Sequence, residues 1–258
     1  MKLKDKVGLI TGASQGIGRS IAFRLAAEGM AVAVLARSEE KLRALAEQIK
    51  SQNVRCLVFP ADLSLPHTAG EFVAAAVQHF GKIDLLVNNA GATKRGDFLT
   101  LTEQDWSDGF TLKFFGAVRL CRAAWPHLVA SQGNIVNIAG VGGRTGSAEF
   151  TIGGAVNAAM LNLTKSLADR GQVEKVRINA INPGFIRTDR LKVRIQRLAK
   201  EKAISEEAAA TEMIENMGID RFGEPDEIAA MVAFLASGEA GYCQGAIIDV
   251  DGGVTRTL

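Results

Sequence analysis

The chain has 258 residues, of which 47% are hydrophobic and 22% charged, and its net charge is +2. This length and composition fit one soluble domain with a large core, and the small charge favours neither nucleic-acid nor membrane binding. No run approaches the roughly 20 apolar residues that a membrane span needs. The cysteines Cys56, Cys121 and Cys243 are scattered, without disulfide density or metal-site spacing. We therefore expect a cytoplasmic protein without a metal.

Short apolar runs without polar alternation predict strands that are covered on both faces. These runs span residues 7–10, 31–36, 54–59, 84–88, 134–138, 177–182 and 246–250. Amphipathic stretches between them predict helices over 16–29, 39–51, 67–81, 103–129, 150–170 and 225–238. The alternation predicts one α/β domain over residues 1–258, with a doubly wound, seven-stranded parallel sheet and three helices on each side.

Residues 187–220 interrupt this alternation and predict a helical insertion, a lid over the carboxyl ends of the strands. The first half of the insertion is basic: Arg187, Arg190, Lys192, Arg194, Arg197, Lys200 and Lys202. A solvated helix face explains these charges. The alternative is an entrance that attracts an acidic substrate.

A glycine-rich turn follows the first predicted strand and opens a helix. Glycines let a phosphate approach the backbone, and the helix N-terminus offers free N–H groups to it. The spacing is GxxxGxG rather than GxGxxG, and a tight turn alone is the alternative explanation. Its place between strand and helix favours a dinucleotide site formed by Gly12, Ser14, Gln15, Gly16, Ile17 and Gly18.

The end of the second strand carries the signal for cofactor choice. An NAD site usually places a carboxylate there, to bind the ribose 2′-hydroxyl. This chain has Ala36, followed by Arg37 and Ser38. Arg37 can bind a 2′-phosphate through its guanidinium fork, with Ser38 adding a hydrogen bond. This favours NADP(H) over NAD(H), although an exposed arginine at a helix start is the alternative.

Together with the turn, later motifs resemble the short-chain dehydrogenase/reductase family over nearly the whole chain. They are Asp62-Leu63, the NNAG run ending in Asn89, Ala90 and Gly91, the segment with Pro183, Gly184, Ile186 and Thr188, and the landmarks 221–225 and 249–253. The resemblance implies a Rossmann fold, adenine contacts at Asp62, a nicotinamide site around Pro183 and Thr188, a small-molecule substrate, and a homotetramer or homodimer. NADP-dependent members often have Lys or Arg where this chain has Gln15.

The catalytic residues of the family do not match. Aligned without gaps, the family's serine falls on Gly140, its tyrosine on Gly153, its lysine on Asn157 and its asparagine on Lys113. The chain has one tyrosine, Tyr242, where the family commonly has a structural one. Glycine offers no proton, and positioned acid–base catalysis supplies about 10²–10⁴-fold in rate. Ordinary carbonyl reduction is therefore expected to be slow.

Lys113 is a candidate replacement for the lost group, because Leu112, Phe114 and Phe115 suggest an apolar setting that lowers its pKa. Asn157 is a second candidate, as a hydrogen-bond donor to the nicotinamide ribose. A structural or solvated lysine is the alternative for Lys113. The two glycines predict a wider pocket above the nicotinamide.

Three functions remain open. The first is an NADP(H)-dependent oxidoreductase with a non-standard proton route and an unidentified small organic substrate, for which an acidic group is one alternative. The second is a catalytically inactive, cofactor-binding sensor or scaffold. The third is non-redox chemistry in the pocket, with the dinucleotide as a structural element.

Overall fold

The computed structural model of the protein describes residues 2–256. Its strands form one parallel sheet in the order β3-β2-β1-β4-β5-β6-β7. They are β1 (Val7–Thr11), β2 (Ala31–Ala36), β3 (Cys56–Pro60), β4 (Leu85–Asn88), β5 (Asn134–Ile138), β6 (Arg177–Pro183) and β7 (Ile247–Val250). The apolar runs thus form the predicted seven-stranded sheet. The chain reverses its direction of winding between β1 and β4, and ligands bind at such a switch point in doubly wound sheets.

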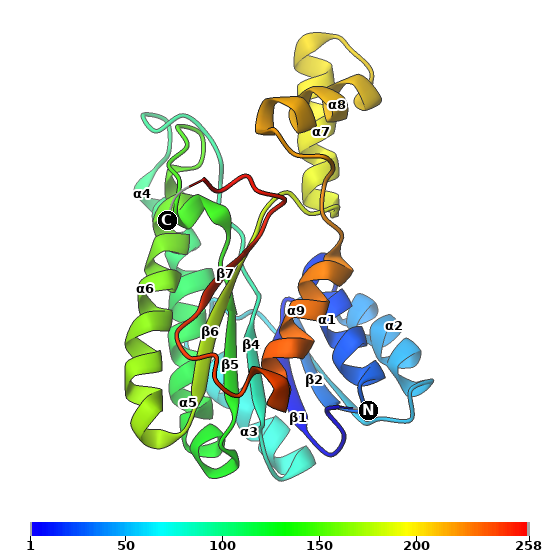
Figure 1. The fold of residues 1–258 in the computed structure, drawn as a ribbon, viewed down its shortest axis with the longest axis vertical. Helices are drawn as coiled ribbons and strands as arrows, with labels where there is room; N and C mark the ends of the chain where they lie inside the picture. The colour runs from blue at the N-terminus through cyan, green and yellow to red at the C-terminus, as the bar shows by residue number, and fades with distance from the viewer. Residues whose placement is uncertain (1, 257–258) are drawn as a thin grey trace.

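In the described residues 2–256, three helices cover each face of the sheet, as predicted. One layer holds α1 (Gly16–Ala27), α2 (Glu39–Lys50) and α9 (Pro225–Ala236), and the other holds α3 (Thr68–Phe80), α5 (Gly116–Ser131) and α6 (Thr151–Glu174). Each layer encloses its own buried cluster, one around Ile21, Leu45 and Val232, and one around Phe72 and Leu120. Figure 1 shows α1, α2 and α9 on one side of the sheet and α5 and α6 on the other.

The long helix predicted over 103–129 is divided into three parts. It begins as α4 (Glu103–Gly109), passes through a π-helical turn, η1 (Phe110–Phe115), and continues as α5. A reciprocal capping box between Thr102 and Asp105 fixes its start. A π-helical turn contains extra residues and redirects the side chains after it, and such turns are frequent at functional sites. Lys113 lies within this turn.

The insertion forms two helices, α7 (Asp189–Lys202) and α8 (Glu206–Met217). Their apolar side chains form a separate small cluster, in which Leu191 and Met213 pack with Ile219 and Phe222. Figure 1 shows both helices beyond the carboxyl ends of the strands, apart from the two layers. The insertion therefore has its own packing and stands at the edge of the sheet where a ligand would bind.

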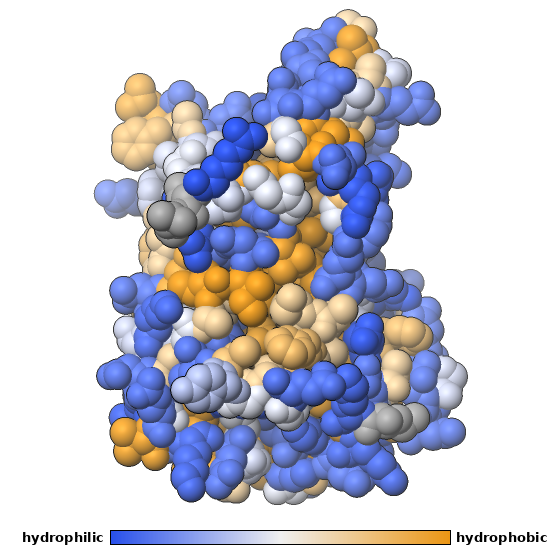
Figure 2. Space-filling model, in the orientation of Figure 1, coloured by the Kyte–Doolittle hydropathy of each residue, from blue (hydrophilic) through white to orange (hydrophobic). Residues whose placement is uncertain are grey.

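One face of the molecule shows an apolar area among polar surroundings. In Figure 2 it lies in the middle of the view, where Figure 1 draws β6 and β7. The edge strand β7 is only partly buried in this chain. Within residues 2–256, no helix combines the length and apolarity required to traverse a bilayer.

Candidate functional site

Hydrogen bonds join the glycine-rich turn at the end of β1 to the NNAG run at the end of β4. The Thr11 hydroxyl accepts hydrogen bonds from the backbone N–H groups of Asn89 and Ala90, each at 3.0 Å. The Asn89 side-chain amide donates in turn to the Thr11 carbonyl at 2.9 Å. Two motifs that are about 78 residues apart in sequence therefore form one rigid edge at the switch point.

The glycines of the turn leave a cradle that side chains would fill. Gly12 and Gly16 have φ angles of +66° and +54°, a region that favours glycine. A Cβ atom at Gly18 would lie 2.3 Å from the Gly12 carbonyl oxygen. Gln15 precedes α1 and makes no side-chain cap, so the first N–H groups of α1 face outward without a side-chain acceptor. Together with Ser14 and Ile17 on the same turn, this backbone fits a pyrophosphate.

Two basic residues, Arg37 and Lys41, follow the end of β2 beside the cradle. Ser38 caps α2 by accepting the Lys41 N–H at 3.4 Å, and the Lys41 ammonium reaches the Gln15 side chain at 2.7 Å. The pKa of the Asp62 carboxyl is lowered, chiefly by the Ser64 backbone N–H and in smaller part by the charge of Arg37. Arg37, Ser38 and Lys41 thus border one corner. Lys41 is not among the residues predicted from the sequence, although it stands one helical turn after Arg37.

The predicted nicotinamide segment lies across the cradle. Gly184 packs so closely that a Cβ atom there would lie 2.7 Å from the Asp251 Cα atom. Ile186 forms a β-bridge with Gly223. A Cβ atom at Gly16 would lie 3.1 Å from Thr188 Cγ2, so Thr188 faces the glycine-rich turn.

The remaining predicted cofactor residues lie near the same edge. Pro183 is the last residue of β6, and Gly91 closes the NNAG run just after the end of β4. Leu63 is 3% exposed and belongs to the core, so only its backbone is available to a ligand. The structure thus brings the predicted cofactor residues to one side of the sheet, with the Leu63 side chain turned inward.

Lys113 reaches from the π-helical turn to the residue that follows β5 and to α6. Its Nζ atom donates to the Ala139 carbonyl at 2.7 Å and to Asn157 Oδ1 at 2.6 Å. Burial lowers the pKa of Lys113 to about 7, and repulsion from Arg190 adds to this. An ammonium group has three N–H donors, so one remains after these two bonds. The side chain keeps some exposure and can meet a ligand.

Gly140 lies next to Asn157, the side chain that accepts a hydrogen bond from Lys113. Gly140 has a φ angle of +148°, and a Cβ atom there would lie 2.9 Å from Asn157 Nδ2. Its N–H donates to Asn182 Oδ1 at 3.1 Å. Asn157 is 5% exposed. A side chain at position 140 would therefore be both strained and in contact with the Lys113–Asn157 pair.

The expectation of a wider pocket is wrong at Gly153. A Cβ atom there would lie 2.0 Å from Cζ of Phe150, so the phenyl ring fills the space next to the glycine. The Arg95 guanidinium lies 4.3 Å from the centre of the same ring. The sequence showed the missing side chain at 153 but not the ring that replaces it.

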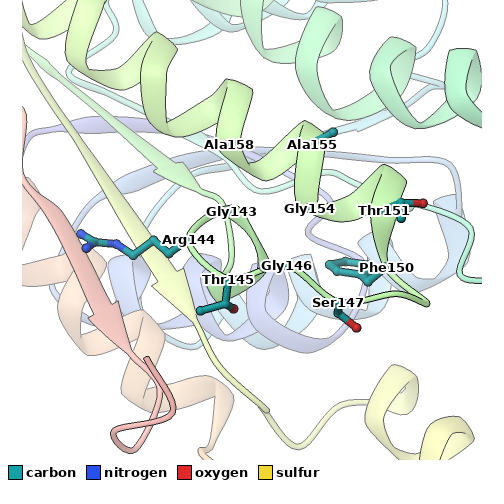
Figure 3. A pocket seen from close by; sticks show the side chains of 11 residues that line it. Gly143, Arg144, Thr145, Gly146, Ser147, Phe150, Thr151, Gly154, Ala155 and Ala158 are labelled. Carbon is teal, nitrogen blue, oxygen red and sulfur yellow. The ribbon is translucent and has the colours of Figure 1, made fainter. Parts of the chain in front are cut away.

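A pocket of about 350 Å³ adjoins this ring. It is lined by the loop from Gly142 to Ser147, by Phe150 and by the first turns of α6, and none of the predicted cofactor residues lines it. Figure 3 shows the Phe150 ring between this loop and the start of α6. Tyr242 is fully exposed and precedes the amino end of β7, whereas the site lies at the carboxyl ends. Within this chain, Tyr242 therefore does not contribute to the site.

Comparisons with known proteins agree with this geometry. A family model described as "Enoyl-(Acyl carrier protein) reductase" matches residues 12–255. The 3-oxoacyl-[acyl-carrier-protein] reductase FabG of Staphylococcus epidermidis is 35% identical over 255 residues, covering 97% of this chain and 99% of the relative. The short-chain reductase protein NovJ of Streptomyces niveus is 35% identical over 251 residues, covering 97% and 94%.

Solved structures of similar proteins cover almost the whole chain. L-sorbose reductase of Gluconobacter frateurii, complexed with NADPH and L-sorbose, has a TM-score of 0.95 at 31% identity and covers 100% of both chains. NAD⁺-bound xylitol dehydrogenase has a TM-score of 0.91 at 28% identity, covering 98% of this chain and 100% of that chain. With the sheet order and the joined motifs at its edge, these matches show that the chain belongs to the short-chain dehydrogenase/reductase family.

Proposed function

We propose that the protein is an NADP(H)-dependent oxidoreductase in which Lys113, rather than a tyrosine, exchanges the proton with the substrate. One observation carries this proposal: Lys113 Nζ bonds Asn157 Oδ1 at 2.6 Å inside the site. By the family alignment, these two positions hold asparagine and lysine in the reverse order. The cation therefore comes from the π-helical turn instead of from α6.

The cofactor residues of this proposal are those of the cradle and its borders. The glycine-rich turn and the start of α1 hold the pyrophosphate, and Thr188 holds the nicotinamide end. Arg37 and Lys41 supply two cations for a 2′-phosphate, with Ser38 between them, which supports NADP(H) over NAD(H). When bound, NADP(H) supplies or accepts a hydride.

Lys113 holds the proton at Nζ. Two of its N–H donors are used by Ala139 and Asn157, so the third is available to the substrate atom that gains negative charge. A pKa of about 7 puts both protonation states in reach at neutral pH, as efficient proton transfer requires. Asn157 acts as a positioning residue, because its Oδ1 atom fixes the ammonium.

A cofactor-binding sensor or scaffold without turnover is the second candidate. The observation that favours it is the Phe150 ring against Gly153, since this ring fills space where the family places its proton donor. The Arg95 guanidinium covers the same ring. In a sensor, this stack would close the site, and the cofactor alone would be the signal.

Four further features belong to the proposal. The helices α7 and α8 act as a lid, supported by their separate packing at the carboxyl ends. The substrate is acidic, supported by the arginines of α7. A homotetramer or homodimer is supported by the apolar area around the open edge strand β7. The free cysteines, Cys56, Cys121 and Cys243, favour a cytoplasmic location.

The test uses NADPH that carries deuterium on the transferred side, with a panel of ketones, enones and imines. We expect label in at least one product, and a loss of about 10²-fold or more in Lys113→Met with unchanged NADPH affinity. Lys192→Met, an exposed lysine on α7, is the matched control. Transfer by Lys113→Met at the rate of the unsubstituted protein would refute the proton route. No transfer to any compound, with NADPH bound, would favour the sensor.

A further inference from the structure

Three arginines from two segments lie close enough to the Lys113 site for their charges to act on one another. Arg190 and Arg194 are one turn apart on α7 and lie on the same face of this helix. Arg95 follows the NNAG run, on the loop between β4 and α4. Burial lowers the pKa of Arg95, and the charge of Arg194 lowers it further. Glu149 opposes these effects, which shows that its carboxylate lies near the same group.

These arginines differ from the cations next to them in sequence. Lys94 pairs with Asp105 at 2.9 Å, Arg187 with Glu224 at 3.0 Å, and Arg197 with Glu201 at 2.6 Å. Among residues 2–256, none of Arg95, Arg190 and Arg194 has a carboxylate within 4.0 Å. The outer cations thus form ion pairs, whereas the inner three have no ion pair, and Glu149 is the carboxylate that acts on Arg95 and Arg194 from a greater distance.

Two chains of contact connect the three arginines to the site. Arg190 Nη2 donates to the Gly91 carbonyl at 2.8 Å, and the Lys113 side chain packs on Gly91, where a Cβ atom would lie 2.7 Å from Lys113 Cδ. Arg95 stacks on Phe150, which lies against Gly153. Gly91 therefore contacts both Arg190 and Lys113, and the Phe150 ring lies between Arg95 and Gly153.

We propose that Arg95, Arg190 and Arg194 form a subsite for a carboxylate or phosphoryl group of the substrate, next to the carbon that reacts. Planar guanidinium groups bind these anions through two parallel hydrogen bonds, and a bound anion would offset the repulsion that Arg190 and Arg194 exert on the charge of Arg95. The proposal rests on the proposed function, because it assumes that the substrate binds beside Lys113. It narrows the substrate to a small acid, such as an oxo acid or an unsaturated acid.

Arg194 is already placed to receive a planar group. Its guanidinium lies 4.8 Å from the centre of the Phe185 ring, which orients the plane but leaves its N–H donors free of carboxylates in the described chain. Arg190 uses one N–H on Gly91 and keeps the others. Since α7 carries both residues, binding of an anion would also hold this helix over the site.

The experiment is calorimetric titration of NADPH-saturated protein with oxalate, with inorganic phosphate, and with the uncharged oxamide. We expect oxalate or phosphate to bind and oxamide not to bind. Arg95→Gln and Arg194→Gln should each weaken anion binding by about tenfold or more. Lys192→Gln removes the same charge from α7 outside the subsite and should leave the affinity unchanged. Arg194→Lys keeps the charge but loses the fork, so it should recover only part of the affinity.

Opposite outcomes would overturn the subsite. The absence of anion binding by the unsubstituted, NADPH-loaded protein is one, and equal weakening in Arg194→Gln and Lys192→Gln is the other, because it would show only a long-range charge effect. NADPH affinity is measured by fluorescence for every variant. Intact NADPH binding without anion binding refutes the subsite alone. If the unsubstituted protein does not bind NADPH, the proposed function is refuted. Oxalate titration of the cofactor-free protein then shows whether the subsite binds an anion.

Discussion

The titration of Lys113 is the most direct consequence of the site geometry. Burial and the charge of Arg190 lower its pKa from 10.5 to about 7. Roughly half of the Lys113 side chains are therefore ammonium at pH 7, about nine tenths at pH 6 and about one tenth at pH 8.

The measurement is carbon NMR of protein labelled at the lysine ε-carbons. One resonance should titrate with a midpoint near pH 7, and Lys113→Met should remove it, whereas Lys192→Met should not. If every lysine resonance titrates above pH 9, the proposed burial of the amine is wrong, and the proton route built on it loses its basis.

Stability gives an independent check on the same pKa. The folded-state pKa of Lys113 lies below its unfolded value, so between pH 7 and 10.5 the unfolded chain binds more protons and stability rises with pH. Relative to Lys113→Met, the free energy of unfolding should increase by up to about 2 kcal/mol from pH 7 to pH 9. Below pH 7, the difference between the two proteins should become constant. Urea unfolding at several pH values measures it, and a difference that does not change with pH would contradict the argument.

Two further variants test the cofactor corner and the filled space. Combined Arg37→Ala and Lys41→Ala should weaken NADPH binding by about tenfold or more and leave NADH binding unchanged, because only NADPH has the 2′-phosphate; equal losses in fluorescence titration would contradict this. Gly153→Tyr should cost about 1–3 kcal/mol of stability by overpacking against Phe150, and adding Phe150→Ala should recover most of it. Thermal and urea unfolding measure both effects, and an equally unstable double variant would show that the ring is not the obstacle.

The strands could be predicted because a short, continuous apolar run is buried on both faces when it forms a strand of a parallel sheet covered by helices on both sides. The run at 134–138 became β5 with the same bounds, and residues 31–36 became β2. The glycine-rich turn was predictable for a similar reason, since a backbone with positive φ at Gly12 and Gly16 restricts the residue types it accepts.

The details of the proton site were not visible in the pattern. No residue type marks the π-helical turn at Phe110–Phe115, because the added residues only change the phase of an amphipathic helix. The Phe150 ring belongs to a loop residue whose place depends on the backbone before α6. Lys113 could be selected by alignment, but its contact with Asn157 required the relative placement of two helices.

The cost of burying Lys113 connects the proton site with the anion subsite. The ammonium has two neutral acceptors, and repulsion from Arg190 disfavours its charge. A bound carboxylate beside Arg190 would offset this repulsion and favour the ammonium, so the pKa of Lys113 should rise when the anion binds. We therefore expect its NMR midpoint to move upward with saturating oxalate and NADPH, and not with oxamide. In Arg190→Gln, the midpoint should already be higher without a ligand, because one source of repulsion is gone. An unchanged midpoint with oxalate bound would show that Lys113 and the anion subsite act separately, and that the bound anion does not favour protonation of Lys113.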